Sequence, residues 1–193
     1  MFMDDSELHI ANSDLPLLIH GDDGHGASLF SVSVMADLYA RGAKLVFLCG
    51  YHMARDEFEL QTQSKQDSII VSEDFEAAKV ESKRVIFIPS KQPELLRQVL
   101  ESLSDSDERV VFFKNFDLFD DSVFAVVEKL SNVVVMGNID NCSYKTELLA
   151  KNWVTQVYFS VPQIEVQTKI PELEKYKGYL KSDNKEGVVS LAQ

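Results

Sequence analysis

Short apolar runs recur along the chain at the length of β-strands, and stretches with helical spacing separate them. The runs are continuously hydrophobic, which is typical of strands that are covered on both faces. They occupy residues 15–20, 44–49, 68–71, 84–88, 109–113, 132–136 and 155–159. The pattern predicts an α/β fold with a mainly parallel sheet of about seven strands.

The segments between these runs carry helix signals. Residues 26–41 are almost entirely apolar and stop at Gly42, while apolar residues recur at helical spacing after Pro93 and again from Val123. Strands that alternate with helices form right-handed crossover units, so we expect a doubly wound sheet with helices on both faces. Ligands of such sheets bind at the carboxyl ends of the strands, where we therefore expect the functional site.

Both ends of the chain depart from this alternation. We predict a polar leader over residues 1–14, an α/β domain over 15–160 and a tail over 161–193. In the tail, apolar pairs at 179–180 and 188–189 flank a polar turn, which indicates a β-hairpin. A length of 193 residues suits one core with appended ends.

Charge and composition narrow the expected partners and location. The formal net charge of −12 gives a surface that repels phosphate backbones, so we do not expect nucleic-acid binding. No segment approaches the roughly 20 apolar residues that span a bilayer. The acidic N-terminus lacks the features of a secretion signal, so we expect a cytoplasmic protein without membrane contact. Cys49 and Cys142 are expected to be buried, reduced thiols.

A glycine-rich segment links the first expected strand to the first expected helix. It reads Gly21-Asp22-Asp23-Gly24-His25-Gly26-Ala27-Ser28 and has the spacing of the P-loop motif G-x-x-x-x-G-K-[ST]. In that motif, backbone amides surround phosphates, the lysine reaches the β- and γ-phosphates, and the hydroxyl binds magnesium. Here the lysine is replaced by alanine. The candidate nucleotide-binding residues of this segment are Gly21, Gly24, His25, Gly26, Ala27 and Ser28.

Over residues 15–160 the chain resembles the RecA/KaiC-like branch of P-loop ATPases. Residues 40–48 resemble the helix exit and second strand of that family, and residues 109–113 resemble its Walker B strand. Residues 133–136, with Asn138 and Asp140 beyond them, resemble the strand whose tip carries a polar sensor residue. The resemblance implies a site for ATP and magnesium and an edge-to-edge oligomer, and it adds Lys114 and Asn138 to the candidate nucleotide-binding residues.

The chain also departs from that family at its chemical residues. The Walker B aspartate falls at Lys114, and the acid that would activate water falls within Cys49-Gly50-Tyr51. Phosphoryl transfer depends on positioning and on neutralising the charge of the transferred group, so we predict no catalytic residues. Asp22 and Asp23 would each cost on the order of 1 kcal/mol or more beside a polyphosphate.

These departures predict a pseudo-ATPase that serves as a protein-interaction or regulatory module, alongside an active ATPase. We expect a protein partner or a homo-oligomer, and neither a metal ion nor a nucleotide as cofactor. The alternative is an atypical ATP-binding protein or ATPase that uses ATP and magnesium through non-standard residues at the strand tips.

Two features each allow two interpretations. Lys114 either supplies an ammonium group at the metal position, giving a metal-independent nucleotide site, or extends its head into water. His20, Asp22, Asp23 and His25 either form a zinc or manganese site, or His20 ends a buried strand with satisfied hydrogen bonds. A loop plugged by His25 or Lys114 would favour a structural role for residues 21–28, and an open loop would favour ligand binding.

Overall fold

The central feature of the computed structural model is a nine-stranded sheet. The structure describes residues 10–21, 24–49, 53–72, 74–89, 93–102, 108–119, 121–163, 170–183 and 186–190. In spatial order the strands are β3, β4, β2, β5, β6, β1, β7, β8 and β9. Their bounds are β1 Leu17–His20, β2 Lys44–Cys49, β3 Ser68–Ile70, β4 Val85–Ile88, β5 Arg109–Lys114, β6 Val133–Gly137, β7 Thr155–Tyr158, β8 Lys177–Ser182 and β9 Glu186–Ser190.

The predicted fold class is confirmed. Strands β1 to β7 pair in parallel and match the apolar runs of the sequence, whereas β8 and β9 pair antiparallel and extend the sheet beyond β7. The first strand begins at Leu17 because Pro16 has no amide hydrogen to donate to a neighbouring strand. The sheet therefore exceeds the predicted size by the two strands of the C-terminal hairpin.

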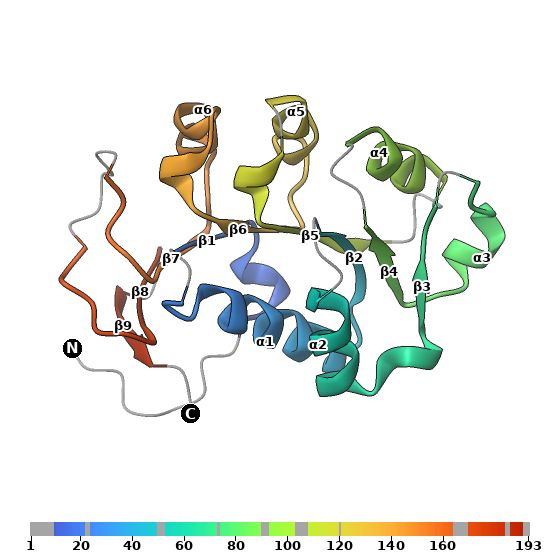
Figure 1. Ribbon diagram of the computed structural model, residues 1–193, viewed down its shortest axis with the longest axis horizontal. Helices are drawn as coiled ribbons and strands as arrows, with labels where there is room; N and C mark the ends of the chain where they lie inside the picture. Colours follow the sequence, from blue (N-terminus) through green and yellow to red (C-terminus); the bar gives the residue numbers. More distant parts are fainter. Residues whose placement is uncertain are drawn as a thin grey trace.

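Helices cover both faces of the sheet (Figure 1). Helices α1 (Ala27–Ala40) and α2 (Met53–Thr62) lie on one face, and α4 (Pro93–Ser102), α5 (Phe124–Val127) and α6 (Lys145–Ala150) lie on the other. The short α3 (Ala77–Glu81) contributes Val80 to the core on the α4 side. Short 3-10 helices complete the described elements: η1 Asn12–Asp14, η2 Ser64–Gln66, η3 Phe116–Leu118, η4 Asp121–Val123 and η5 Ile139–Asn141.

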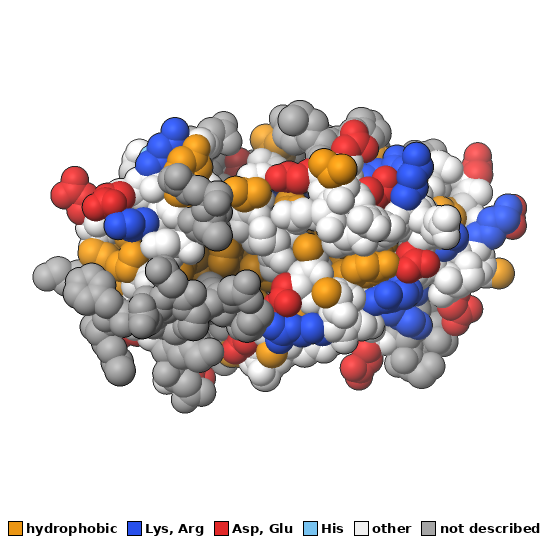
Figure 2. Space-filling model, turned by 90° about the horizontal axis from the view of Figure 1, so that it is seen from below, with side chains coloured by type: hydrophobic (Ala, Val, Ile, Leu, Met, Phe, Trp, Pro, Cys, Tyr) orange, Lys and Arg blue, Asp and Glu red, His pale blue; other side chains and the backbone are white. Residues whose placement is uncertain are grey.

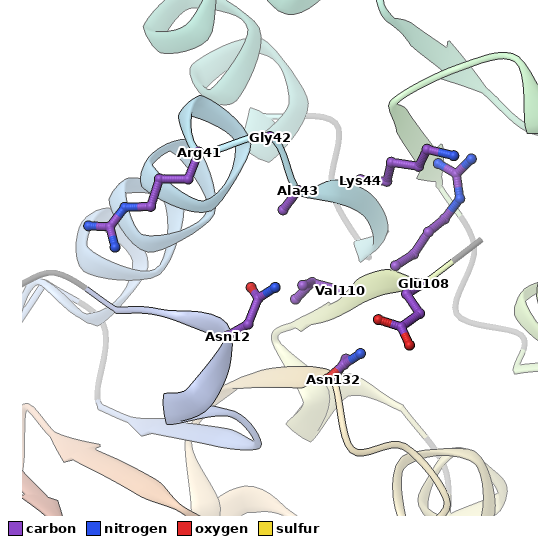
Figure 3. Close-up of a pocket in the computed structure, with 9 residues that line it drawn as sticks. Asn12, Arg41, Gly42, Ala43, Lys44, Glu108, Val110 and Asn132 are labelled. Carbon is purple, nitrogen blue, oxygen red and sulfur yellow. The ribbon is translucent and has the colours of Figure 1, made fainter. Parts of the chain in front are cut away.

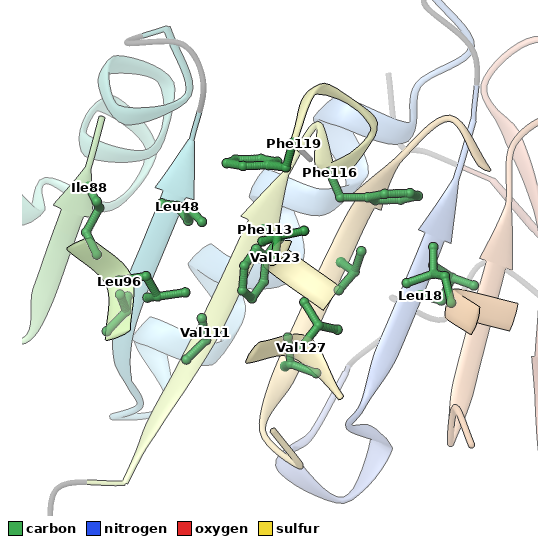
Figure 4. Close-up of a cluster of buried hydrophobic side chains, with 14 of the residues drawn as sticks. Leu18, Leu48, Ile88, Leu96, Val111, Phe113, Phe116, Phe119, Val123 and Val127 are labelled. Carbon is green, nitrogen blue, oxygen red and sulfur yellow. The ribbon is translucent and has the colours of Figure 1, made fainter. Parts of the chain in front are cut away.

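Each face of the sheet has its own hydrophobic core. On the α1 side, Phe47 packs against Phe58 and Phe112, with ring centroids 4.8 and 5.3 Å apart. Figure 4 shows the core on the opposite side, where Phe113 and Phe116 lie among aliphatic side chains on the face of the sheet that α4, α5 and α6 cover. Burial of each such side chain contributes about 1.5–3 kcal/mol. Both cores hold the strand ends in a fixed arrangement.

Residues of a strand alternate between these two cores, and β5 shows the consequence most clearly. Val110 and Phe112 belong to the core on the α1 side, whereas Val111 and Phe113 belong to the other core. Because the side-chain period of a strand is two residues, Lys114 follows Phe112 onto the face that α1 covers. The strand thus delivers a lysine from its carboxyl end to the same side as the P-loop helix.

The surface is mixed in charge on the face covered by α1 and α2. Figure 2 shows acidic and basic side chains interspersed on the described part of that face, with small hydrophobic areas between them. Among the described residues, none of the helices has both the length and the hydrophobicity that crossing a bilayer requires.

Candidate functional site

The glycine-rich segment runs from the end of β1 into the first turn of α1. Gly24 and Gly26 have φ angles of +80° and +104°, in the left-handed region that favours glycine. Gly26 is the N-cap of α1 and supplies no side-chain hydrogen bond to the helix, and its carbonyl accepts from the amide of Phe30 at 2.9 Å. Gly26 therefore provides no side-chain acceptor for the first backbone amides of α1.

Gly21 and Ala27 close this segment against the core. A Cβ atom at Gly21 would lie 2.7 Å from the Cβ of Ala27 and 3.0 Å from that of Phe159, so only glycine fits there. Ala27 is 1% exposed and packs in the core on the α1 side. The position that carries the P-loop lysine in the motif thus holds a buried methyl group that faces Gly21. Asp22 and Asp23 lie outside the described residues.

Lys114 and Ser28 meet at the start of α1. The Nζ atom of Lys114 donates a hydrogen bond to the Oγ atom of Ser28, although the two residues are 86 positions apart in sequence. Lys114 is 8% exposed, so its head does not extend into water. In the motif, the hydroxyl at this position binds magnesium, and the resemblance places the metal's aspartate at the tip of this same strand. An ammonium group therefore lies next to the hydroxyl that the motif assigns to the metal.

The tip of β6 is built around the carboxylate of Asp117, which is not among the candidate nucleotide-binding residues predicted from the sequence. A Cβ atom at Gly137 would lie 2.3 Å from Oδ1 of Asp117, which also accepts a hydrogen bond from the amide of Asn138 at 3.2 Å. The side chain of Asn138 accepts from the amide of Asp140 at 2.8 Å and so caps η5. Gly137 at the end of an apolar strand was the signal in the sequence for such a close approach.

His20 follows Leu18 onto the face of the sheet that α4, α5 and α6 cover, here called the far face, which is opposite to the face of Lys114. It is fully buried, its Nδ1 accepts from the amide of Ile139 at 3.1 Å, and its Nε2 lies 3.1 Å from Oγ of Ser160. An acceptor at Nδ1 requires the neutral tautomer with hydrogen on Nε2, which then donates to Ser160. Both ring nitrogens are thus engaged in structural hydrogen bonds.

The metal hypothesis for the glycine-rich segment receives no support from these contacts. Within the part of the chain that the structure describes, no three His, Cys, Asp or Glu side chains are placed to hold a metal ion. His25 has a buried Nδ1 atom without a hydrogen-bond partner among the described residues. Both ring nitrogens of His20 already have hydrogen-bond partners, and Asp22 and Asp23 of this hypothesis lie outside the described residues.

The far face also contains two groups whose burial changes their acid–base behaviour. Burial raises the pKa of the Cys142 thiol to about 11, and it also raises the pKa of the neighbouring Tyr144 hydroxyl. The Tyr144 hydroxyl donates to the carbonyl of Phe116 at 2.8 Å. As expected from the sequence, Cys142 is a buried free thiol. The side chain of Cys49 lies outside the described residues.

Comparison with known proteins gives structural likeness only. No protein-family model matches the sequence, and no curated protein matches it. The fold is similar to that of the genome packaging NTPase B204 from Sulfolobus turreted icosahedral virus 2, solved in complex with ATP-gammaS. The TM-score is 0.58 and the identity 10%, over 93% of this chain and 97% of that chain. The sulfate complex of the same protein gives a TM-score of 0.58 and 9% identity, over 93% and 96% of the two chains.

A third solved structure, the monomer form of the pCW3 conjugation coupling protein TcpA with ATPgS, is less similar. Its TM-score is 0.46 and its identity 11%, over 93% of this chain and 60% of that chain.

The likeness to B204 extends over nearly the whole length of both chains and agrees with the strand–loop–helix arrangement of Gly21 to Ser28. The chain has the fold of the P-loop NTPases.

Proposed function

We propose that this chain is a P-loop ATPase-like domain that does not hydrolyse ATP and that acts as a protein-interaction or regulatory module beside an active ATPase. The observation that carries the proposal is the hydrogen bond from Lys114 to Ser28. Magnesium in ATPase sites takes oxygen ligands at about 2.1 Å, commonly a carboxylate, a hydroxyl and substrate phosphates. A buried ammonium group in contact with the hydroxyl leaves these residues unsuited to the metal.

The other departures support the same proposal. Ala27 supplies no cation to a triphosphate, and its burial against Gly21 uses that position for packing. The N-cap residue Gly26 leaves the first amides of α1 without a side-chain acceptor from that position, which favours an anion there, but hydrolysis also needs a metal or an equivalent charge placed on the transferred group. A domain of this kind retains the shape of an ATPase subunit, which suits it to assembly with related subunits.

A second candidate function is nucleotide binding without metal or hydrolysis. The specific observation in its favour is that Lys114 places a positive charge beside the uncapped start of α1, where an anion is favoured. The structurally similar protein B204 is known in complexes with ATP-gammaS and with sulfate. In this case Lys114 would contact phosphate directly and replace the metal.

Titration of the protein with ATP-gammaS, in magnesium and in EDTA, separates these proposals. The first predicts neither ATP turnover nor magnesium-dependent binding, and the second adds saturable binding that is equal in both conditions and is lost in Lys114→Ala. Magnesium-dependent binding accompanied by ATP turnover would contradict both.

A reversal of the two substitutions tests the physical cause. The double variant Ala27→Lys, Lys114→Asp restores the P-loop lysine and the metal's carboxylate. If these two positions alone prevent binding, magnesium-dependent affinity for ATP-gammaS should rise by about 100-fold or more over the wild type. Lys114→Met, which removes the ammonium without adding a carboxylate, is the matched control and should not show this gain. Circular dichroism on each variant verifies folding.

A further inference from the structure

A pocket lies at the end of the sheet opposite the P-loop, where β2, β5 and β6 begin. Its volume is about 400 Å³, which is within the range of small-ligand sites. Its walls come from η1, from the turn between α1 and β2, and from the starts of β5 and β6, as Figure 3 shows. Since the P-loop follows the carboxyl end of β1, this pocket is separate from the nucleotide position.

The polar side chains of the pocket come from three separate segments. Val110 and Val134 belong to the core on the α1 side, and the two-residue alternation places Glu108 and Asn132 on that same side. Asn12 reaches the pocket from η1. In Figure 3 the side chains of Asn12, Asn132 and Glu108 surround Val110. Two carboxamides and one carboxylate therefore line one space.

The cationic groups of the lining residues are directed elsewhere. Arg41 pairs with Asp37 at 2.8 Å, and the heads of Arg41 and Lys44 point away from the centre of the pocket in Figure 3. The guanidinium group of Arg109 donates to the carbonyls of Lys83 and Glu81, at 2.8 and 3.3 Å. Of the nine lining residues, Glu108 is the one that carries a negative charge.

These three side chains offer acceptors that are not used within the protein. In the described part of the chain, the carboxylate of Glu108 and the carboxamides of Asn12 and Asn132 form no hydrogen bond or ion pair. A guanidinium group carries five N–H donors in one plane and binds a carboxylate through two of them, which leaves donors for the carboxamide oxygens. Ala43 and Val110 provide apolar surface for the methylene groups of an arginine side chain.

We propose that this pocket binds the guanidinium group of an arginine, carried either by a partner protein or by a free arginine-like molecule. Glu108 pairs with the guanidinium, and the two carboxamides accept from its remaining donors. Arginine is preferred to lysine because its planar fork matches a carboxylate flanked by two further acceptors, whereas an ammonium group is a single point of charge. The proposal is independent of whether the P-loop retains any affinity for nucleotide.

NMR titration of the full chain with N-acetyl-L-arginine amide tests the proposal. The side-chain NH₂ resonances of Asn12 and Asn132 should shift in a saturable manner, because both carboxamides lie at the proposed contact. N-acetyl-L-citrulline amide has nearly the same shape without the charge, and it should produce no saturable shift.

Two variants sharpen this titration. Glu108→Gln should weaken binding of the arginine probe by about tenfold or more, since it removes the charge and one strong acceptor. Glu101→Gln, on α4 at the other face, is the matched control and should leave the affinity unchanged. The proposal is overturned if neither Asn12 nor Asn132 shifts with up to ~10 mM probe, or if Glu108→Gln binds as well as the wild type.

Free L-arginine as a third probe identifies the source of the group. Equal affinity for free and capped arginine supports a small-molecule ligand, and tighter binding of the capped form supports an arginine within a polypeptide. Either result requires the Asn12 and Asn132 shifts described above.

Discussion

The carboxyl ends of β1 and β5 present two very different environments on the two faces of the sheet. On the α1 side, Lys114 donates a hydrogen bond to Ser28 at the start of α1, whose N-cap residue Gly26 supplies no side-chain hydrogen bond. On the far face, His20 forms hydrogen bonds with the amide of Ile139 and the hydroxyl of Ser160, and the Tyr144 hydroxyl donates to the carbonyl of Phe116. The hydrogen bonds of His20 with Ile139 and of Tyr144 with Phe116 are buried, and that of His20 with Ser160 is partly buried.

Because of this difference, the hydrogen bonds that stabilise these strand ends are not the same as the contact that bears on ligand binding. Buried polar groups that are all paired stabilise one arrangement, and removal of any one leaves an unpaired partner. A buried lysine loses its hydration, so its contact with a hydroxyl contributes little net stability. Among the polar contacts at these strand ends, we therefore expect those of the far face to contribute more to the stability of the fold, and the contact on the α1 face to matter more for ligand binding.

The largest expected effect comes from Gly137→Ala. The added Cβ would overlap Oδ1 of Asp117 and would break the hydrogen bond that the amide of Asn138 donates to Asp117. We expect a loss of about 3 kcal/mol in the free energy of unfolding, measured by urea denaturation. In a double-mutant cycle, Asp117→Ala should relieve much of the steric part of this loss. Additive losses would show that Asp117 does not cause the strain.

His20→Ala should destabilise the fold by about 2–3 kcal/mol, because it opens a cavity and leaves the amide of Ile139 without its acceptor. His20→Asn is the conservative variant, since its Oδ1 can replace the ring Nδ1 as acceptor, and it should recover about 1 kcal/mol of the loss. Urea denaturation of both variants provides the comparison. Equal destabilisation by Asn and Ala would argue that packing alone, and not the hydrogen bond to Ile139, stabilises this face.

Lys114→Met should change the free energy of unfolding by less than about 1 kcal/mol in either direction. Methionine keeps most of the length of the side chain, and it removes the cost of burying the ammonium together with its bond to Ser28. The same urea denaturation is used. A loss above about 3 kcal/mol would show that the Lys114 contact on the α1 face also stabilises the fold, contrary to the difference between the two faces described above.

The smallest effect concerns the reactivity of Cys142. Burial raises its pKa to about 11, so little thiolate exists near neutral pH, and alkylation by iodoacetamide at about pH 8 should be at least about tenfold slower than in the urea-unfolded chain. Residue-specific mass spectrometry distinguishes Cys142 from Cys49. Since the folded pKa lies above the ordinary thiol value, the contribution of this group to stability is present below that ordinary value and is lost as the pH rises through about 11. Equal labelling rates in the folded and unfolded chain would contradict a tightly packed far face.

Local sequence pattern was sufficient for the parallel strands and for the glycine-rich segment. Continuous runs such as the one that became β5 predict buried parallel strands because each residue must be apolar whichever face it meets. The same pattern could not show that β8 and β9 extend the sheet, since that depends on pairing with β7 across the chain. Helix α2 was not predicted because its sequence is rich in charged residues and lacks a clear apolar stripe. Phe58 is its residue in the core on the α1 side, and that contact depends on tertiary packing.

By itself, the sequence determined that a P-loop spacing follows the first strand, that alanine replaces its lysine, and that lysine ends the fifth strand. Only the tertiary structure decided that Lys114 contacts Ser28 and that His20 accepts a hydrogen bond from the amide of Ile139, since these contacts join residues 86 and 119 positions apart. The physical reason is that residue type and spacing act locally. Which side chains share a strand end depends on the order of strands in the sheet, and that order is set by the packing of the whole chain.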